Sequence, residues 1–224
     1  MSFKRRTISR TSQSISPNAA IKMMESSYLA ASSALIWVAL YYLPIGGSLF
    51  RLALPLPIAL LQVRRGSFSG IEGVSLAVLL LSILMGPIRG PLFLFPYGFL
   101  ALWLGWSWQR RFSWWLSWSC GVVIGICGFF LRVFILSILV GENLWIIITR
   151  AGAVLIERCV ELFGSQFVPE MIHIQLVAFA LVVVQEIIYV LTLHALAFWI
   201  FPRLKAPIPD PPAFLNGLVV LDPH

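Results

Sequence analysis

Apolar residues are gathered into six runs along the chain, and the runs end at proline, glycine or arginine. The runs cover residues 28–43, 52–63, 71–85, 92–108, 114–140 and 173–201. A helix needs about 20 mostly apolar residues to cross the hydrocarbon core of a bilayer. Most of the runs approach or exceed that length once their flanks are included. The pattern therefore predicts an all-α membrane protein with six transmembrane helices.

The second run is short for a membrane span and contains Pro55 and Pro57. Adding residues 47–51 brings it close to the required length, with the Arg51 side chain reaching toward the interface. Each proline lacks an N–H and blocks one helical hydrogen bond, so a kink is expected here. Backbone groups freed inside a membrane must be covered by protein or line a water-filled cavity. The prolines therefore indicate either a structural kink or a broken helix beside a transport site.

The stretch 144–163 is apolar but interrupted by charges. Arg150, Glu157 and Glu161 recur at helical spacing and fall on one stripe. This pattern favours an amphipathic helix between the fifth and sixth spans, lying at the interface or packed over the bundle. A seventh span is the alternative interpretation.

Positive charges at the ends of the runs distinguish six spans from seven. With six spans and the N-terminus inside, eleven of the sixteen Lys and Arg residues are cytoplasmic. A seventh span would move Arg203 and Lys205 to the outside. Because cytoplasmic loops carry an excess of Lys and Arg, the sequence predicts six spans with both termini in the cytoplasm. The plasma membrane and the thylakoid membrane both fit this prediction.

The composition agrees with a membrane protein and argues against several other classes. The chain is 59% hydrophobic and 11% charged, about half the charged fraction of a soluble domain. Its net charge is +7, but no basic face with polar or aromatic neighbours suggests a nucleic-acid partner. No Cys/His spacing suggests a metal, and no common enzyme motif is present. We expect no catalytic residue, metal or cofactor.

Three segments follow from these patterns. Residues 1–25 form a basic cytoplasmic tail that we expect to be disordered. Residues 26–205 form the six-span membrane domain, which contacts the lipid bilayer. Residues 206–224 are expected to be a second disordered tail.

Charged side chains inside the spans are the first candidates for function. A charge at the centre of a span costs about 3 kcal/mol on insertion scales, so it needs a partner or a use. Arg132 lies in the fifth span, and Gln185 and Glu186 lie near the middle of the sixth. We expect Arg132 and Glu186 to form either an ion pair that fixes helix register or part of a substrate or proton site.

Two further groups of residues suggest contacts outside the spans or between them. Glu142 and Asn143 follow the fifth span and either rim an outward cavity or cap a helix. Ala30 and Ala34 form a pair of small residues four apart in the first span. Small residues let another helix approach closely. That helix belongs either to a partner protein or to the neighbouring span, and our prediction is that the alanines face another protein.

Several stretches together resemble a known family. The second span reads "LPLPIALLQVRRG", the fourth ends "LGWSWQRR", and the last opens at "FVPEMI" and ends "FPRLK". Over roughly residues 25–205, this series resembles the YybS-like family of six-span membrane proteins of unknown function. That family is in turn similar to the substrate-binding S-components of energy-coupling factor transporters.

The resemblance implies a function and partners. S-components are six-helix proteins that bind a vitamin or metal ion and dock on a transmembrane coupling protein driven by two ATPases. Their first helix often docks through an Ala-x-x-x-Ala face, and Ala30 and Ala34 match that spacing. The expected function is a transport component that binds a small molecule. The alternative is a non-transport subunit or assembly factor of a larger membrane complex.

The topology can be checked by cysteine labelling. In a chain whose native cysteines are replaced by serine, Ser14→Cys and Asp210→Cys should resist a membrane-impermeant thiol reagent in sealed cells. Glu142→Cys, which follows the fifth span, should be labelled and serves as the positive control. Labelling at either terminal site in sealed cells contradicts the predicted orientation.

Overall fold

Helices are the only regular elements in the part of the chain that the computed structural model describes, which is residues 16–43, 47–150, 152–153, 170–206, 208–210 and 212. The α-helices are α1 (Pro17–Tyr42), α2 (Gly47–Ala53), α3 (Leu56–Arg65), α4 (Ser67–Met85), α5 (Arg89–Leu92), α6 (Phe99–Gln109), α7 (Trp114–Val140) and α9 (Met171–Ile200). A kinked segment, η1 (Leu94–Gly98), joins α5 to α6, and within it Phe95 has the extended angles φ = −112° and ψ = 114°. A 3₁₀ turn, η2 (Pro202–Leu204), follows α9.

Four of these helices are long and apolar enough to cross a membrane, judged by length and composition: α1, α4, α7 and α9. Most of their residues are not buried inside the protein, and large apolar side chains cover their outer surfaces. Ile83 of α4 is 81% exposed, and Ile138 of α7 is 66% exposed. Apolar surface of this extent is stable only against lipid or a partner. The fold is that of an all-helical, multi-pass membrane protein.

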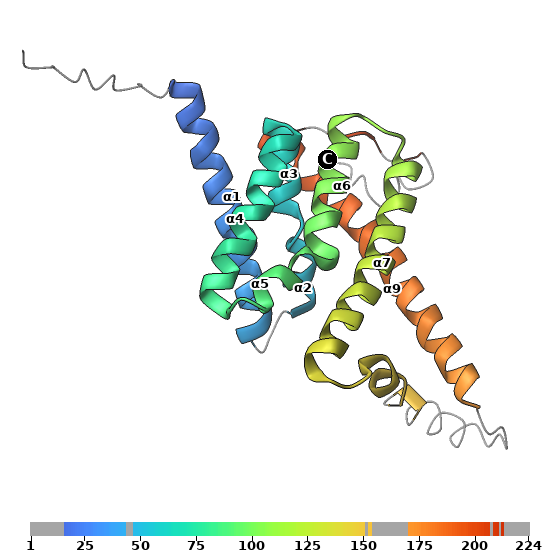
Figure 1. The fold of residues 1–224 in the computed structure, drawn as a ribbon. Helices are drawn as coiled ribbons and strands as arrows, with labels where there is room; N and C mark the ends of the chain where they lie inside the picture. The colour runs from blue at the N-terminus through green and yellow to red at the C-terminus, as the bar shows by residue number, and fades with distance from the viewer. Residues whose placement is uncertain are drawn as a thin grey trace, which may run out of the picture.

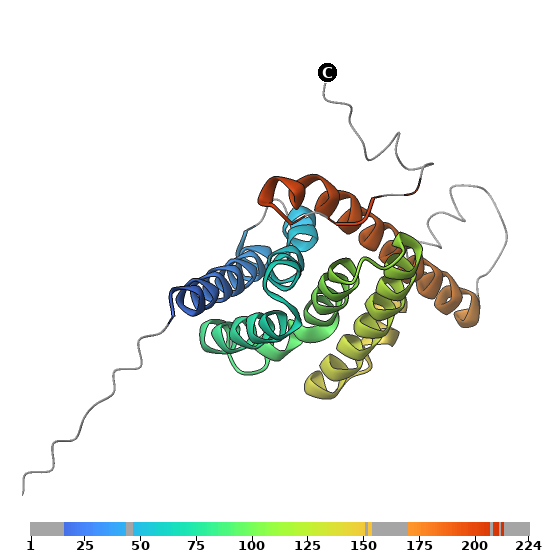
Figure 2. The same cartoon turned by 90° about the horizontal axis from the view of Figure 1, so that it is seen from above.

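The chain also runs from one end of the bundle to the other in two further segments, which we call passes (Figure 1). Neither pass is a single helix. One consists of α2 followed by α3, and the other of α5, η1 and α6. Of the six expected spans, four are single helices long enough to cross a membrane, whereas each of the other two passes is assembled from shorter pieces. Seen from above, α9 runs obliquely along one side of the other helices (Figure 2).

The break between α2 and α3 lies where the two prolines were expected to kink the chain. In an unbroken helix, the Arg51 carbonyl would accept a hydrogen bond from the N–H of residue 55, which is Pro55 and has none. Instead, the Tyr189 hydroxyl of α9 donates to the Arg51 carbonyl at 3.0 Å. The Ser33 hydroxyl of α1 donates to the Leu54 carbonyl at 3.2 Å. The helix is thus interrupted between Ala53 and Leu56, and side chains from two other helices satisfy backbone groups there.

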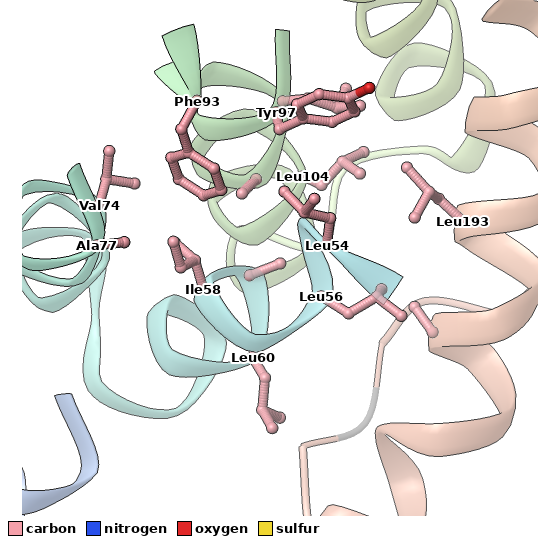
Figure 3. Packing of buried hydrophobic residues seen from close by; sticks show 14 of the residues in the cluster. Leu54, Leu56, Ile58, Leu60, Val74, Ala77, Phe93, Tyr97, Leu104 and Leu193 are labelled. Atoms are coloured by element: carbon pink, nitrogen blue, oxygen red, sulfur yellow. The ribbon is translucent and has the colours of Figure 1, made fainter. Parts of the chain in front are cut away.

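The apolar core lies where α1, α3, α4, α6 and α9 meet. Figure 3 shows Ile58 of α3, Val74 and Ala77 of α4, and Leu193 of α9 converging around Leu54 and Leu104, all of them buried. Phe93 and Tyr97, from the interrupted pass, cover one side of this cluster. Trp37 of α1 packs edge-on against both rings. The broken passes therefore form the centre of the bundle rather than its edge.

Small residues set the close approaches between helices. Ala30 and Ala34 are 2% and 0% exposed and lie in the core of this chain. The prediction that they face another protein is therefore corrected: the chain's own helices occupy that face of α1. Gln62 of α3 is held between Gly70 and Gly105, where an added Cβ would lie 2.9 Å from the Gln62 Cβ in both cases.

Helices α7 and α9 cross one another (Figure 1), and two glycines of α7 lie against side chains of α9. A Cβ at Gly121 would lie 2.9 Å from Val190, and a Cβ at Gly125 would lie 2.5 Å from the Glu186 carboxylate. Gly121 and Gly125 form a Gly-x-x-x-Gly pair, the spacing that lets membrane helices pack closely. This spacing is present in the sequence and is a signal that could have predicted the contact.

The segment boundaries differ from those expected at both ends of the membrane domain. Helix α1 begins at Pro17, so residues 17–25 belong to it rather than to a disordered tail. Ala206 and Ile208 are 3% and 8% exposed and pack in the core, which corrects the expected tail boundary at 206. Residues 144–150 are helical. Most of the predicted amphipathic helix beyond them, with Glu157 and Glu161, lies outside the described residues, as do 1–15 and 213–224.

The packing of α3 against α6 gives a testable consequence. Gly105→Ala places a methyl group 2.9 Å from Gln62 and 3.1 Å from the Ala59 carbonyl, so the two helices must separate. Overpacking of this kind costs about 1–3 kcal/mol, and the variant should unfold at a lower temperature in detergent. Gly47→Ala is the control, because its Cβ meets Leu40 at an ordinary 3.8 Å. Equal melting temperatures for the two variants would contradict this packing.

Candidate functional site

The Glu186 carboxylate is buried in the middle of α9, and its partner comes from α2. Arg51 Nη2 donates to Glu186 Oε1 at 3.5 Å. The Glu186 side chain is fully buried, whereas the Arg51 side chain is 32% exposed. A buried carboxylate is stable only when it is paired or hydrogen-bonded. Arg51 therefore supplies the opposite charge beside the buried Glu186 carboxyl group.

Two neighbouring residues of α9 hold the same arginine. With its amide oxygen turned toward the guanidinium, Gln185 accepts hydrogen bonds from Arg51 Nη1 at 2.9 Å and Nη2 at 2.8 Å. The Arg51 guanidinium also lies over the Tyr189 ring at 5.4 Å, a cation–π arrangement. The Tyr189 hydroxyl also donates to the Arg51 carbonyl. Helix α9 therefore contacts both the backbone and the side chain of Arg51.

Arg132 of α7 is not the partner of Glu186, which corrects the ion pair expected from the sequence. Arg132 Nη2 donates to the Tyr41 hydroxyl at 2.9 Å, and its guanidinium lies over the Trp37 ring at 5.4 Å. The physical reason is the break in the second pass, which places Arg51 beside α9. There it occupies the position next to Glu186 that Arg132 was expected to take.

Arg51 and Arg132 line one cavity of about 220 Å³, together with Pro96, Tyr97, Phe129, Val133 and Leu136. Among the described residues, Arg132 forms no ion pair with an acid. Arg51 Nε is buried without a hydrogen-bond acceptor in the same part of the chain, and Glu186 Oε2 is buried there without a donor. The cavity is thus lined by two arginines. Among the residues that the structure describes, the neighbouring Glu186 carboxylate pairs only with Arg51, so the cavity keeps a net positive charge.

Such a cavity is suited to a small anion. A guanidinium binds carboxylate and phosphate oxygens through paired N–H donors, and these bonds are stronger away from bulk water. The volume is below the roughly 300–1,000 Å³ typical of pockets for drug-sized ligands, so a ligand of few atoms is favoured. Within the described residues, no group of three potential metal-ligating side chains comes together.

Glu142 and Asn143 line a separate, wider cavity of about 650 Å³ beside Ser137 and Trp145. Asn143 Oδ1 accepts from the backbone N–H of Trp145 at 3.1 Å and of Ile146 at 3.3 Å. Asn143 is therefore a helix cap, which was one of the two expected roles. This cavity and the arginine cavity share Val133 in their walls. The sequence prediction thus located a neighbouring cavity rather than the arginine cavity itself.

A second buried polar group joins α6, α7 and α9. His194 Nε2 lies 3.0 Å from the Ser117 hydroxyl, which lies 2.7 Å from that of Ser107. His194 Nδ1 lies 2.9 Å from the Val190 carbonyl. A serine beside a histidine is a familiar nucleophile and base, but all three side chains here are buried. We interpret the chain of hydrogen bonds as a link between helices.

The model of the family described as "Predicted membrane protein (DUF2232)" matches residues 30–216. The chain belongs to this family. No curated protein and no solved structure matches the chain. The match supports a membrane protein, whereas the narrower resemblance to YybS-like proteins and S-components gains no support from it.

The partner of Glu186 can be identified with a double-mutant cycle. Arg51→Ala and Glu186→Ala should each lower stability in detergent, because each leaves a charge without its partner. The double variant should recover part of the loss, with a coupling energy of roughly 0.5–3 kcal/mol. The matched cycle of Arg132→Ala with Glu186→Ala should be additive. If the stability losses of Arg51→Ala and Glu186→Ala simply add, and those of Arg132→Ala and Glu186→Ala do not, then Arg132 is the partner of Glu186, as the sequence suggested.

Proposed function

We propose that this protein is a membrane transport component that binds a small anion between α2, η1 and α7. The observation that supports the proposal is the cavity shared by Arg51 and Arg132. These two arginines come from different passes of the chain and are held in place by aromatic rings and Gln185 as well as by Glu186. An ionisable residue inside a membrane domain is by default a functional candidate.

The interrupted passes also support a transport function. Broken helices bring backbone groups and charged side chains to the middle of a bilayer, where many transporters bind their substrates. Arg51 lies four residues before the proline break, and Pro96 of the other broken pass lines the same cavity. Both interruptions thus contribute a residue to the proposed site.

The six-pass topology belongs to this proposal. The four long helices and the two interrupted passes would each cross the membrane, with both termini in the cytoplasm. In that arrangement the arginine cavity lies in the outer half of the bundle, because α2 begins at the outer side and Arg132 is close to the end of α7. An ATPase-driven coupling complex, as used by S-components, is one way to drive uptake from such a site.

A different feature favours the alternative, a non-transport subunit of a larger complex. An apolar groove of about 540 Å³ lies between α4, α6 and α7, lined in part by Ile71, Trp103 and Leu131. A groove of this kind inside a membrane accepts a lipid chain or a helix of another protein.

Mass spectrometry of the protein purified in mild detergent distinguishes the two functions. Coupling and ATPase subunits or a retained small anion support transport, and a stoichiometric unrelated complex supports the alternative.

Anion binding at the cavity can be tested directly. Acetate, succinate and phosphate are added to the purified protein at constant ionic strength, and the melting temperature is followed. At least one of them should stabilise the protein, and Arg132→Gln should weaken that binding about tenfold or more, since a lost charged contact is worth at least about 1.4 kcal/mol.

The control for this experiment is Arg150→Gln, an exposed arginine outside the cavity. It removes the same charge and should leave anion binding unchanged. If none of the three anions stabilises the protein, or if both variants lose the response equally, the cavity is not an anion site of this kind.

A further inference from the structure

A second positively charged cavity lies at the opposite end of the bundle from the arginine cavity. It has a volume of about 490 Å³ and is lined by Arg64, Arg65, Trp108, Gln109, Arg111 and Lys205, among others. These residues come from three separate parts of the chain: the last turn of α3, the end of α6 with the residues just after it, and the residue after η2. We call this the basic cavity.

The charges of the basic cavity are only partly neutralised. Glu25 of α1 forms ion pairs with Arg64 at 3.1 Å and with Arg65. Arg111 and Lys205 have no acidic partner in the part of the chain that the structure describes. Four cations and one carboxylate leave a clear positive excess, concentrated on the side formed by Arg111 and Lys205.

The backbone at these two residues is unusual. Arg111 has φ = 53° and Lys205 has φ = 59°, and no other described residue except glycine has a positive φ. L-amino acids avoid this region, which glycine enters freely. The chain thus carries a cationic side chain at each of two positions where glycine would be easier to accommodate. A functional requirement for the charges would account for this choice.

The position of the basic cavity identifies the chemistry of its ligand. Trp103, Trp106, Trp114, Trp115 and Trp118 lie on both sides of the turn that carries Arg111, and tryptophan gathers at the level of lipid headgroups. Basic pockets between membrane helices at this depth bind phosphate-bearing headgroups. We propose that the basic cavity binds a phosphate group, supplied by the headgroup of an anionic phospholipid or by a soluble phosphate.

The test measures the melting temperature of the full chain in neutral detergent. Dioleoylphosphatidylglycerol is titrated against dioleoylphosphatidylcholine, and sodium phosphate against sodium chloride at equal ionic strength. Arg111→Gly with Lys205→Gly should raise the melting temperature without lipid, because both residues are relieved of the unfavourable φ. The same variant should bind phosphatidylglycerol or phosphate about tenfold more weakly, because two charges near the ligand are lost.

The matched control is Arg110→Gln with Arg203→Gln, which removes two exposed charges from the same end of the molecule but none from the cavity. A saturable response to phosphatidylglycerol that survives in the control and is lost in the cavity variant supports a lipid site. The same result with sodium phosphate alone supports a soluble ligand. Equal losses in both variants, or no response of the wild-type chain, would overturn the proposal. Arg111→Gln with Lys205→Gln repeats the test should the glycine variant not fold.

Discussion

The rest of this structure depends on one constraint: backbone groups inside a membrane need partners from the protein itself. Pro55 removes the N–H that the Arg51 carbonyl would have used, and the Tyr189 hydroxyl takes its place. The Ser33 hydroxyl donates to the neighbouring Leu54 carbonyl. Segments far apart in the sequence, α1, α2 and α9, are thereby joined at one point. The break between α2 and α3 is therefore also the place where α1 and α9 bind the second pass of the chain.

This arrangement explains why a charged pair can exist deep in the protein. Because α9 binds the Arg51 carbonyl, the Arg51 side chain stays next to Glu186 and Gln185. Burying an ion pair seldom adds net stability, since the loss of hydration offsets the attraction. A pair held this firmly is better explained by the position it gives Arg51 than by stability. That position is the wall of a cavity whose other cation is Arg132.

The sequence predicted elements that depend on local pattern and misplaced contacts that depend on topology. Apolar runs located the passes, and Pro55 and Pro57 located the break, because both signals lie within a few residues. The partner of Glu186 was missed because depth along two long helices suggested Arg132, whereas the fold brings the short α2 between distant segments. Ala30 and Ala34 showed a close helix contact but not which helix makes it. Gly121 and Gly125 carried the same kind of signal for α7 and α9.

The distribution of cations at the two ends of the bundle has two different physical origins. In the predicted orientation, the excess of Lys and Arg on cytoplasmic loops favours cations at the end that carries the basic cavity, but it does not explain Arg51, Arg89 and Arg132 at the other end. Each of these three lies over an aromatic ring, Tyr189, Tyr41 and Trp37 respectively, at 5.4–5.7 Å. An aromatic face stabilises a cation without cancelling its charge. Of these three arginines, only Arg51 has an acidic partner within the described residues, so this end keeps a positive potential, which a bound anion would neutralise.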